Sequence, residues 1–369
     1  MDNAFILELR PIGNKCSRNC RHCYQPKPSM TEGVLDFENL GRFLKNTLEY
    51  IGQKKFPGLK VVFHGGEPLD KYNWIRDAIE LIKIKCCDIN VEFICHSHGF
   101  QSEEKLLGLL DEKVGFGISF TFPEHNIVTK NDIPPAVYVA NKHHRLYSVQ
   151  IVLTQSFNVT REKLFSFLDL LPENINIKFI PCFAIYKDKE PGLSWEGYYQ
   201  KLVEIYRLLK GTNYWQKFFF EPISWMVSPN QENSEKNLFR GCRFGSTCSI
   251  KNSDIVSLSV DYDGNIYVCN RFAAIKEQKI GNISEDLKIP DLQPQMDRIK
   301  KTIYLQEQVV YYCSSCNLFL DGLCIGIGGC PFHGIYHFEN QGRDLFCEGE
   351  KLFYSRFQYL LHNPEQVAQ

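Results

Sequence analysis

Residues 16–24 read Cys-Ser-Arg-Asn-Cys-Arg-His-Cys-Tyr, a C-x3-C-x2-C run that directly follows a short apolar segment, residues 5–12. That segment is predicted to be a buried β-strand. Three thiolates on one short loop, those of Cys16, Cys20 and Cys23, can hold three irons of a four-iron cluster and leave the fourth without a protein ligand. A zinc site completed by His22 or by a distant ligand is the alternative.

A second motif lies at the end of the next predicted strand, residues 59–64, which runs into Gly65-Gly66-Glu67-Pro68. Two glycines at this point let a ligand approach the backbone closely. The Glu67 carboxylate can pair with an ammonium group through charge-assisted hydrogen bonds. The alternative is an ordinary connection between a strand and a helix.

The rest of the first half repeats the same pattern of short apolar runs and longer amphipathic ones. Further strands are predicted at residues 91–95, 114–120, 147–153 and 175–181, and helices at residues 36–51, 74–84, 103–110, 134–141, 160–170 and 195–209. Six β–α repeats with right-handed crossovers predict an α/β fold, an open partial (β/α)6 barrel. Its chemistry belongs at the carboxyl ends of the strands. A doubly wound sheet is the alternative architecture.

Composition excludes several classes of function. The chain has 369 residues, 44% of them apolar, with a net charge of −1 and a pI of about 6.8. A neutral chain has no broad field that would attract nucleic acid or an anionic membrane. The N-terminus does not have the pattern of a signal peptide, and no apolar run approaches the roughly 20 residues that span a bilayer. We therefore expect a cytoplasmic protein.

The fifteen cysteines indicate metal rather than disulfides, because the cytosol keeps thiols reduced. Eight crowd the last third: Cys242, Cys248, Cys269, Cys313, Cys316, Cys324, Cys330 and Cys347. Eight is the right number for two fully ligated four-iron clusters. A pair of zinc ribbons is the alternative, although the Gly264-x4-Cys269 and Gly-Gly-Cys330-Pro patterns are not typical of them. From residue 236 the chain is rich in loops, so we expect metal rather than a large core to stabilise it.

The two N-terminal motifs together resemble the radical S-adenosylmethionine (SAM) superfamily. The resemblance implies that Cys16, Cys20 and Cys23 bind a [4Fe–4S] cluster and that SAM chelates its open iron. It implies that Gly65, Gly66 and Glu67 hold the SAM amino group. The remaining SAM contacts that it implies are Tyr24, Ser119 and Lys130. The cofactor would supply a 5′-deoxyadenosyl radical that abstracts hydrogen from a substrate.

The C-terminal cysteines resemble a SPASM domain, the auxiliary-cluster module of radical SAM enzymes that act on peptides. The resemblance implies two further [4Fe–4S] clusters, one on Cys242, Cys248, Cys269 and Cys330, the other on Cys313, Cys316, Cys324 and Cys347. The expected division is a radical SAM partial barrel at 1–182, a bridging region at 183–235 and a SPASM domain with a C-terminal helix at 236–369.

Barrel and SPASM domain together imply an oxidoreductase that matures a peptide or a protein. Ribosomal-peptide maturation by carbon–carbon, ether or thioether crosslinking is the first hypothesis, and peptide epimerisation is a variant of it. Sulfatase maturation to formylglycine is the alternative, although its enzymes usually carry a basic aspartate where Asn270 stands, and an amide cannot take that proton. A non-catalytic iron–sulfur electron carrier is disfavoured, because it needs no Gly-Gly-Glu-Pro turn.

The resemblance also implies partners: a peptide or protein substrate, a reductant such as a flavodoxin or ferredoxin, and no nucleic acid or membrane. Only 15 residues precede Cys16, so we expect leader recognition to use the barrel, the bridge or a separate protein. The catalytic acid or base is not identified.

Other cysteines and histidines have simpler expected roles. Cys86, Cys87, Cys95 and Cys182 are predicted to be packing or incidental thiols, with a substrate-side role for Cys182 as the alternative. His64, His96 and His98 follow predicted strands and should line the cavity, with SAM contact or proton relay as the alternative.

Overall fold

The computed structural model describes residues 4–12, 16, 35–123, 127–181, 195–221, 223–224, 249, 253–274 and 276–304. The strands are β1 (Phe5–Arg10), β2 (Leu59–Phe63), β3 (Val91–Ser97), β4 (Gly115–Phe120), β5 (Leu146–Leu153), β6 (Asn176–Pro181), β7 (Phe219–Glu221), β8 (Ser257–Asp261), β9 (Asn265–Tyr267) and β10 (Gly281–Asn282). The α-helices are α1 (Phe37–Lys54), α2 (Tyr72–Lys85), α3 (Glu103–Asp111), α4 (Pro135–Lys142), α5 (Arg161–Asp169), α6 (Trp195–Leu209), α7 (Tyr214–Lys217) and α9 (Gln293–Tyr304).

Short 3-10 turns fill several connections. They are η1 (Pro68–Lys71), η2 (Lys130–Asp132), η4 (Phe272–Ala274), η5 (Lys276–Gln278) and η6 (Ile289–Leu292). Local sequence sets the helix ends. Asp36 caps α1 by accepting the Asn39 N–H at 2.8 Å, and the helix ends at Lys55, whose φ is 56°.

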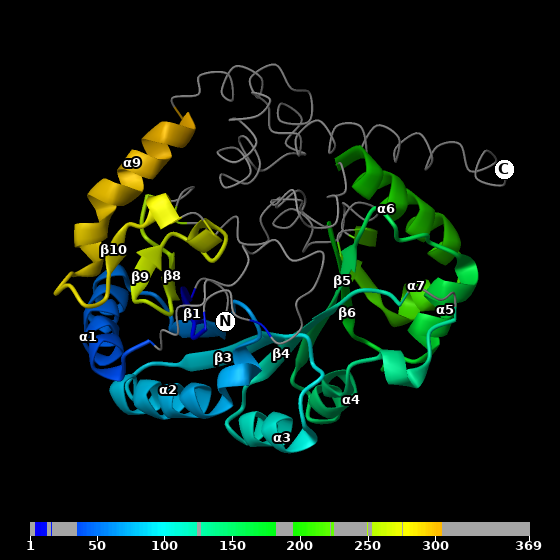
Figure 1. Ribbon diagram of the computed structural model, residues 1–369, viewed down its shortest axis with the longest axis horizontal. Coiled ribbons are helices and arrows are strands. Elements are labelled where there is room, and N and C mark those ends of the chain that lie inside the picture. The colour runs from blue at the N-terminus through cyan, green and yellow to red at the C-terminus, as the bar shows by residue number, and fades with distance from the viewer. Residues whose placement is uncertain are drawn as a thin grey trace.

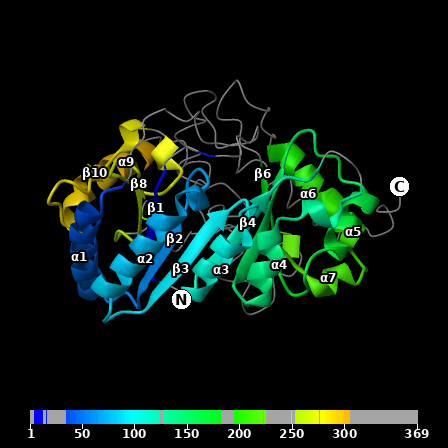
Figure 2. The same cartoon turned by 60° about the horizontal axis from the view of Figure 1, so that its bottom comes forward.

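The strands form one sheet in the order β10-β9-β8-β1-β2-β3-β4-β5-β6-β7. Strands β1 to β6 are parallel and follow chain order, so each crossover returns on the same side. Figure 1 shows α1 to α5 in an arc outside the curved sheet, and Figure 2 shows β1 to β4 side by side in order. The predicted α/β fold with a parallel sheet is confirmed. A doubly wound sheet is wrong for this chain, because its strand order would reverse.

The two faces of the sheet differ. Leu7, Leu9 and Phe63 belong to the large core beneath the helices, which is the outer face. Ile6, Val62 and Ile94 form a separate small cluster on the inner face. Because side chains alternate along a strand, Glu8 and Arg10 share the inner face with Ile6.

Two strands beside the six were not predicted. β7 pairs with β6, and β8 pairs with β1 through Ile6↔Ser257 to Arg10↔Asp261, both in parallel. Leu258, Val260 and Ile266 are fully buried in the main core. We expected metal rather than a large core to stabilise the chain from residue 236, but these side chains belong to the main core. The domain division itself stays a prediction, and the predicted C-terminal helix lies outside the described residues.

Candidate functional site

The carboxyl ends of β1 and β2 bring the two N-terminal motifs to one edge of the sheet. Cys16 follows β1 by six residues and is partly exposed. The His64 N–H donates to the Leu9 carbonyl at 2.9 Å, which ties the start of the second motif to β1. The other members of the first motif, Cys20, Cys23 and Tyr24, lie outside the described residues.

The Gly65-Gly66 pair adopts a conformation that only glycine takes easily. The φ angles are 83° at Gly65 and 46° at Gly66. Side chains with a β-carbon are strained there, so the turn keeps a bare backbone where it faces the end of the sheet. This glycine turn fits the SAM that the sequence implied, since a ligand can approach the backbone of glycine closely.

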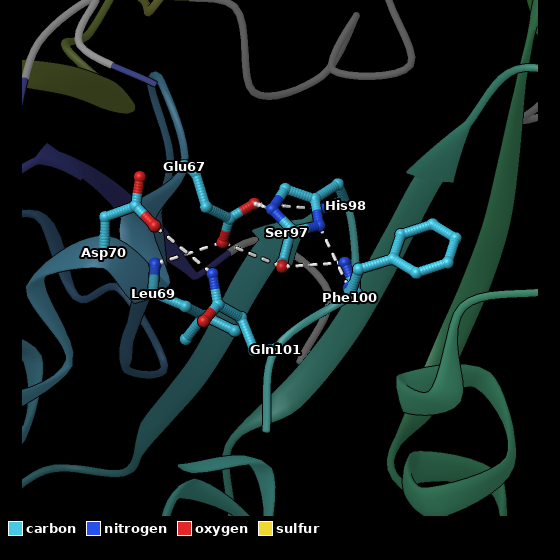
Figure 3. Close-up of polar contacts among 8 residues, drawn as sticks. Glu67, Leu69, Asp70, Ser97, His98, Phe100 and Gln101 are labelled. Atoms are coloured by element: carbon cyan, nitrogen blue, oxygen red, sulfur yellow. Dashed lines mark hydrogen bonds and ion pairs between the residues drawn. The ribbon is translucent and has the colours of Figure 1, made fainter. Parts of the chain in front are cut away.

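The Glu67 carboxylate holds the turn to the end of β3 (Figure 3). Its Oε1 accepts the Ser97 hydroxyl at 2.8 Å and the Leu69 N–H at 3.1 Å, which caps η1. Its Oε2 accepts the His98 N–H at 3.0 Å and lies 3.2 Å from His98 Nε2. Glu67 is 1% exposed. The carboxylate therefore has protein partners at both oxygens.

Burial raises the pKa of Glu67 to about 7, because the charged form loses its hydration. The hydrogen bonds from His98, Ser97 and Leu69 oppose this shift, and the nearby Asp70 charge adds to it. Glu67 thus changes protonation near neutral pH.

Two histidines lie on the inner face beside the turn. The His64 and His96 rings are 5.4 Å apart, and His64 Nδ1 accepts the Gly65 N–H at 2.6 Å. Burial, followed by the charges of His96, Arg10 and Arg271, holds the pKa of His64 well below its usual range. His64 is therefore a neutral imidazole with its proton on Nε2. His96 Nδ1 lies 3.1 Å from Gln150 Nε2.

A second buried carboxylate, that of Glu8, lies where β1 meets β8. The β1/β8 junction consists of Glu8, Arg10, Ser259 and Asp261. Glu8 Oε2 accepts the Asn270 N–H at 2.7 Å. Arg10 is fully buried, with Nη1 3.4 Å from Asp261 Oδ2. Burial raises the pKa of Glu8 to about 7 against the Asn270 hydrogen bond and the Arg10 and Arg271 charges. Burial also raises the pKa of Asp261.

The sequence profile described as "Radical SAM superfamily" matches residues 11–140, the segment that holds Cys16, the glycine turn and strands β2 to β4. Residues 11–140 are therefore similar to the radical SAM superfamily. A curated relative, uncharacterised protein MJ0907 of Methanocaldococcus jannaschii, is 26% identical over 110 residues. That match spans 29% of this chain and 36% of the relative's length.

Solved structures share the fold over most of the chain. Native anSMEcpe with bound AdoMet has a TM-score of 0.69 and 17% identity, covering 98% of this chain and 99% of that one. Another anSMEcpe structure, with AdoMet and the Cp18Cys peptide, gives 0.68. Streptococcus suis SuiB bound to its precursor peptide SuiA gives 0.56 at 15% identity, covering 93% of this chain and 74% of that one. At these identities the likeness shows a shared fold alone.

Two other residues predicted to contact SAM lie apart from the turn. A β-carbon at Gly117 would meet the His96 ring, which lies on the inner face. Ser119 is two residues further along β4, so it lies on the same inner face. Lys130 is exposed, with its Nζ 5.6 Å from the ring centroid of Tyr138 on α4. The structure places Ser119 on the same inner face as His96 and does not bring Lys130 there.

Cysteines outside the first motif divide by burial. Cys86 and Cys95 are buried in the core, where burial raises the pKa of both thiols, that of Cys86 to about 11. Cys87 is exposed, and Cys269 is partly exposed at the end of β9. No disulfide joins the cysteines among the described residues. The remaining predicted ligands, Cys242, Cys248, Cys313, Cys316, Cys324, Cys330 and Cys347, lie outside these residues, as does Cys182.

The described residues contain no group of three His, Cys, Asp or Glu side chains able to hold a metal ion. Only two of the eleven predicted metal ligands, Cys16 and Cys269, are among them. None of the described helices is both long and apolar enough to cross a membrane.

Sequence reasoning missed Glu8 and Arg10. The signal was present in Phe5-Ile6-Leu7-Glu8-Leu9-Arg10, where charged residues alternate with apolar ones in a strand predicted to be buried. Such alternation predicts one apolar and one polar face. It therefore indicated a polar inner face at β1.

Proposed function

We propose that this protein is a radical SAM peptide maturase. It would act on a ribosomally made peptide and form a side-chain crosslink, either carbon–carbon, ether or thioether. The glycine turn after β2, within the segment that matches the superfamily, carries this proposal. The fold likeness to structures that hold the peptides Cp18Cys and SuiA supports a peptide as the substrate.

The residues divide into three groups in this proposal. Cys16, Cys20 and Cys23 hold the [4Fe–4S] cluster at which SAM binds. Gly65, Gly66 and Glu67 would form the wall for the SAM amino group, with further contacts from Tyr24 and Ser119. Two further [4Fe–4S] clusters use the eight cysteines from Cys242 to Cys347.

The bound cofactor supplies a 5′-deoxyadenosyl radical, which removes a hydrogen atom from the substrate. The chain's own residues orient and shield that chemistry. Glu67 keeps the turn fixed through Ser97 and His98, which come from the next strand. His64, held neutral, adds no cation beside Arg10 and Arg271. A fixed turn positions the reacting groups before the reaction begins.

Formylglycine formation, as in a sulfatase maturase, is the second candidate. The fold likeness to anSMEcpe favours it. Asn270 in place of an aspartate argues against it, because an amide cannot accept a proton at neutral pH.

Iron content and SAM cleavage test the cofactor assignment. The anaerobically reconstituted protein should hold about 12 irons in three four-iron clusters. It should release 5′-deoxyadenosine from SAM when dithionite is added. Cys16→Ala should lower the iron content to about 8 and abolish that release. Cys87→Ala, at an exposed thiol, is the matched control and should change neither. Four irons with zinc elsewhere would contradict the SPASM assignment.

A mass shift tests the substrate class. A panel of synthetic peptides that contain cysteine, serine or aromatic residues is incubated with the enzyme, SAM and dithionite. A crosslink, or oxidation of serine to formylglycine, removes two hydrogens and lowers a peptide's mass by about 2 Da. Oxidation of cysteine to formylglycine also replaces sulfur by oxygen from water and lowers the mass by about 18 Da. Fragmentation then separates a crosslink from formylglycine. Release of 5′-deoxyadenosine without any modified peptide, including an epimerised one, would overturn the maturase proposal and leave the radical SAM chemistry standing.

A further inference from the structure

Glu8 is the buried carboxylate to which the proposed chemistry gives no role. It lies on the inner face of β1, between Ile6 and Arg10 on that face, and is 7% exposed. Its pairing partners are Val62 on β2 and Ser259 on β8. Val62 is two residues before His64, so the Cα of Glu8 lies about 7 Å below the start of the glycine turn. The carboxylate is therefore next to the proposed SAM site.

The hydrogen bonding of Glu8 is incomplete compared with that of Glu67. Among the described residues, the Asn270 N–H at 2.7 Å is its one hydrogen-bond donor, and it reaches Oε2. Ser259, in register on β8, is fully buried, and its hydroxyl has no partner among the described residues. Buried polar groups are normally paired, so this pair of side chains can receive a polar group from a ligand.

The charges of Arg10 on β1 and of Arg271 after β9 act on Glu8. Asp261 on β8 and His64 after β2 interact with Arg10 in turn. Arg10 is engaged by Asp261. Burial outweighs the attraction of the two arginines and raises the pKa of Glu8 to about 7. A carboxylate in this range can take up and release a proton at neutral pH.

We propose that Glu8 is the catalytic base of this site, the carboxylate that accepts the proton from the substrate group forming the new bond. The proposal rests on the peptide maturase function. It also predicts which substrates suit the site: peptides whose second reacting group carries an acidic X–H bond, such as a thiol or a hydroxyl.

The proton count balances with Glu8 in this role. The substrate C–H bond breaks when its hydrogen atom is transferred to the 5′-deoxyadenosyl radical. The X–H bond breaks when its proton moves to a Glu8 oxygen, and the C–X bond forms. One electron remains and leaves to an iron–sulfur cluster, which serves as a one-electron acceptor. The substrate thus loses two protons and two electrons in total.

Infrared titration of the reconstituted protein tests the first requirement, that Glu8 changes protonation near neutral pH. The C=O stretch of a protonated buried carboxyl is followed between about pH 5 and pH 9, a range that spans the shifted pKa. The difference between wild type and Glu8→Gln isolates Glu8 from Glu67. A band that disappears with a midpoint near 7 is expected. An ionised Glu8 throughout this range overturns the proposal, and this measurement needs no substrate.

Product partitioning tests the catalytic role. The probe is the first peptide from the panel above that wild type modifies. In Glu8→Gln the amide can still accept the Asn270 N–H, so folding is preserved, but it cannot take a proton. Modified peptide should fall by about 10²- to 10⁴-fold relative to the 5′-deoxyadenosine released. Glu8→Asp should restore part of the product, and circular dichroism checks the fold of both variants.

Glu221→Gln is the matched control. Glu221 is an inner-face carboxylate, 2% exposed, with Oε1 3.2 Å from Lys178 Nζ. The Glu221→Gln variant should give the same ratio of modified peptide to 5′-deoxyadenosine as wild type. An unchanged ratio in Glu8→Gln, or an equal drop in both variants, means that Glu8 is only structural. If wild type modifies no peptide, the maturase function is contradicted. The infrared titration still tests separately whether Glu8 changes protonation near neutral pH.

Discussion

The glycine turn after β2 and the β1/β8 junction each bury a glutamate, and burial raises the pKa of both to about 7. Their partners differ. Glu67 accepts hydrogen bonds from Ser97, His98 and Leu69, whereas the Asn270 N–H is the one donor to Glu8 among the described residues. The same shift thus accompanies two different tasks. A carboxylate with protein partners at both oxygens fixes a loop, and a carboxylate with a spare oxygen can exchange a proton with a ligand.

The largest expected effect is at Glu67. Glu67→Ala leaves the Ser97 hydroxyl and two backbone N–H groups without their acceptor, which should lower the free energy of unfolding by about 3–5 kcal/mol. Urea denaturation under anaerobic conditions measures it. The same variant should lose 5′-deoxyadenosine release. Asp70→Ala, at the exposed carboxylate of the same 3-10 turn, is the control and should unfold like wild type. Similar stability in both variants would mean that Glu67 does not fix the turn.

The second prediction concerns pH. Both glutamates bind protons more tightly when folded, since their pKa values rise from 4.5 to about 7. Their stabilising contribution is complete below pH 4.5 and is lost as pH rises to about 7, by about 3 kcal/mol for each. Urea midpoints measured across this range should fall accordingly. Glu8→Gln should remove about half of the fall, and an unchanged pH dependence would show that Glu8 is ionised throughout.

The third predicted effect on stability is at Tyr50, which contacts the segment just before β8. The Tyr50 hydroxyl of α1 accepts the N–H of buried Ile255, just before β8, at 3.1 Å. Tyr50→Phe leaves that N–H unpaired and should lower the free energy of unfolding by about 1–2 kcal/mol. Tyr138→Phe is the matched control, because the Tyr138 hydroxyl is buried without a partner among the described residues. An equal loss of unfolding free energy in both variants would mean that this hydrogen bond does not stabilise β8.

The smallest effect is at Ser259. Its buried hydroxyl has no partner among the described residues, so Ser259→Ala should leave the free energy of unfolding unchanged or raise it by up to about 1 kcal/mol. Thermal and urea unfolding both report it, with Ser97→Ala as the contrasting variant, since Ser97 bonds Glu67. A clear loss of stability in Ser259→Ala would mean that Glu8 and Ser259 already satisfy each other.

Sequence periodicity predicted β1 to β6 and α1 to α6 to within a few residues, because each element is long and regular enough to show one repeat. It missed the strands β7 to β10, which have three, five, three and two residues and lie outside the regular alternation of strands and helices. The glycine turn was predicted because its chemistry is local. The partners of Glu67 come from Ser97 and His98, thirty residues later, and the donor to Glu8 comes from Asn270. Contacts between distant segments leave no local pattern.

The pairing of β8 with β1 has a consequence for synthesis of the chain. About 250 residues separate the two strands, so one edge of the N-terminal strand stays unpaired until residue 261 has been made. An open strand edge can pair with other chains. During translation this nascent polypeptide would expose Phe5–Arg10 for most of its elongation, and we expect chaperone occupancy there to end when Ser257–Asp261 emerges from the ribosome.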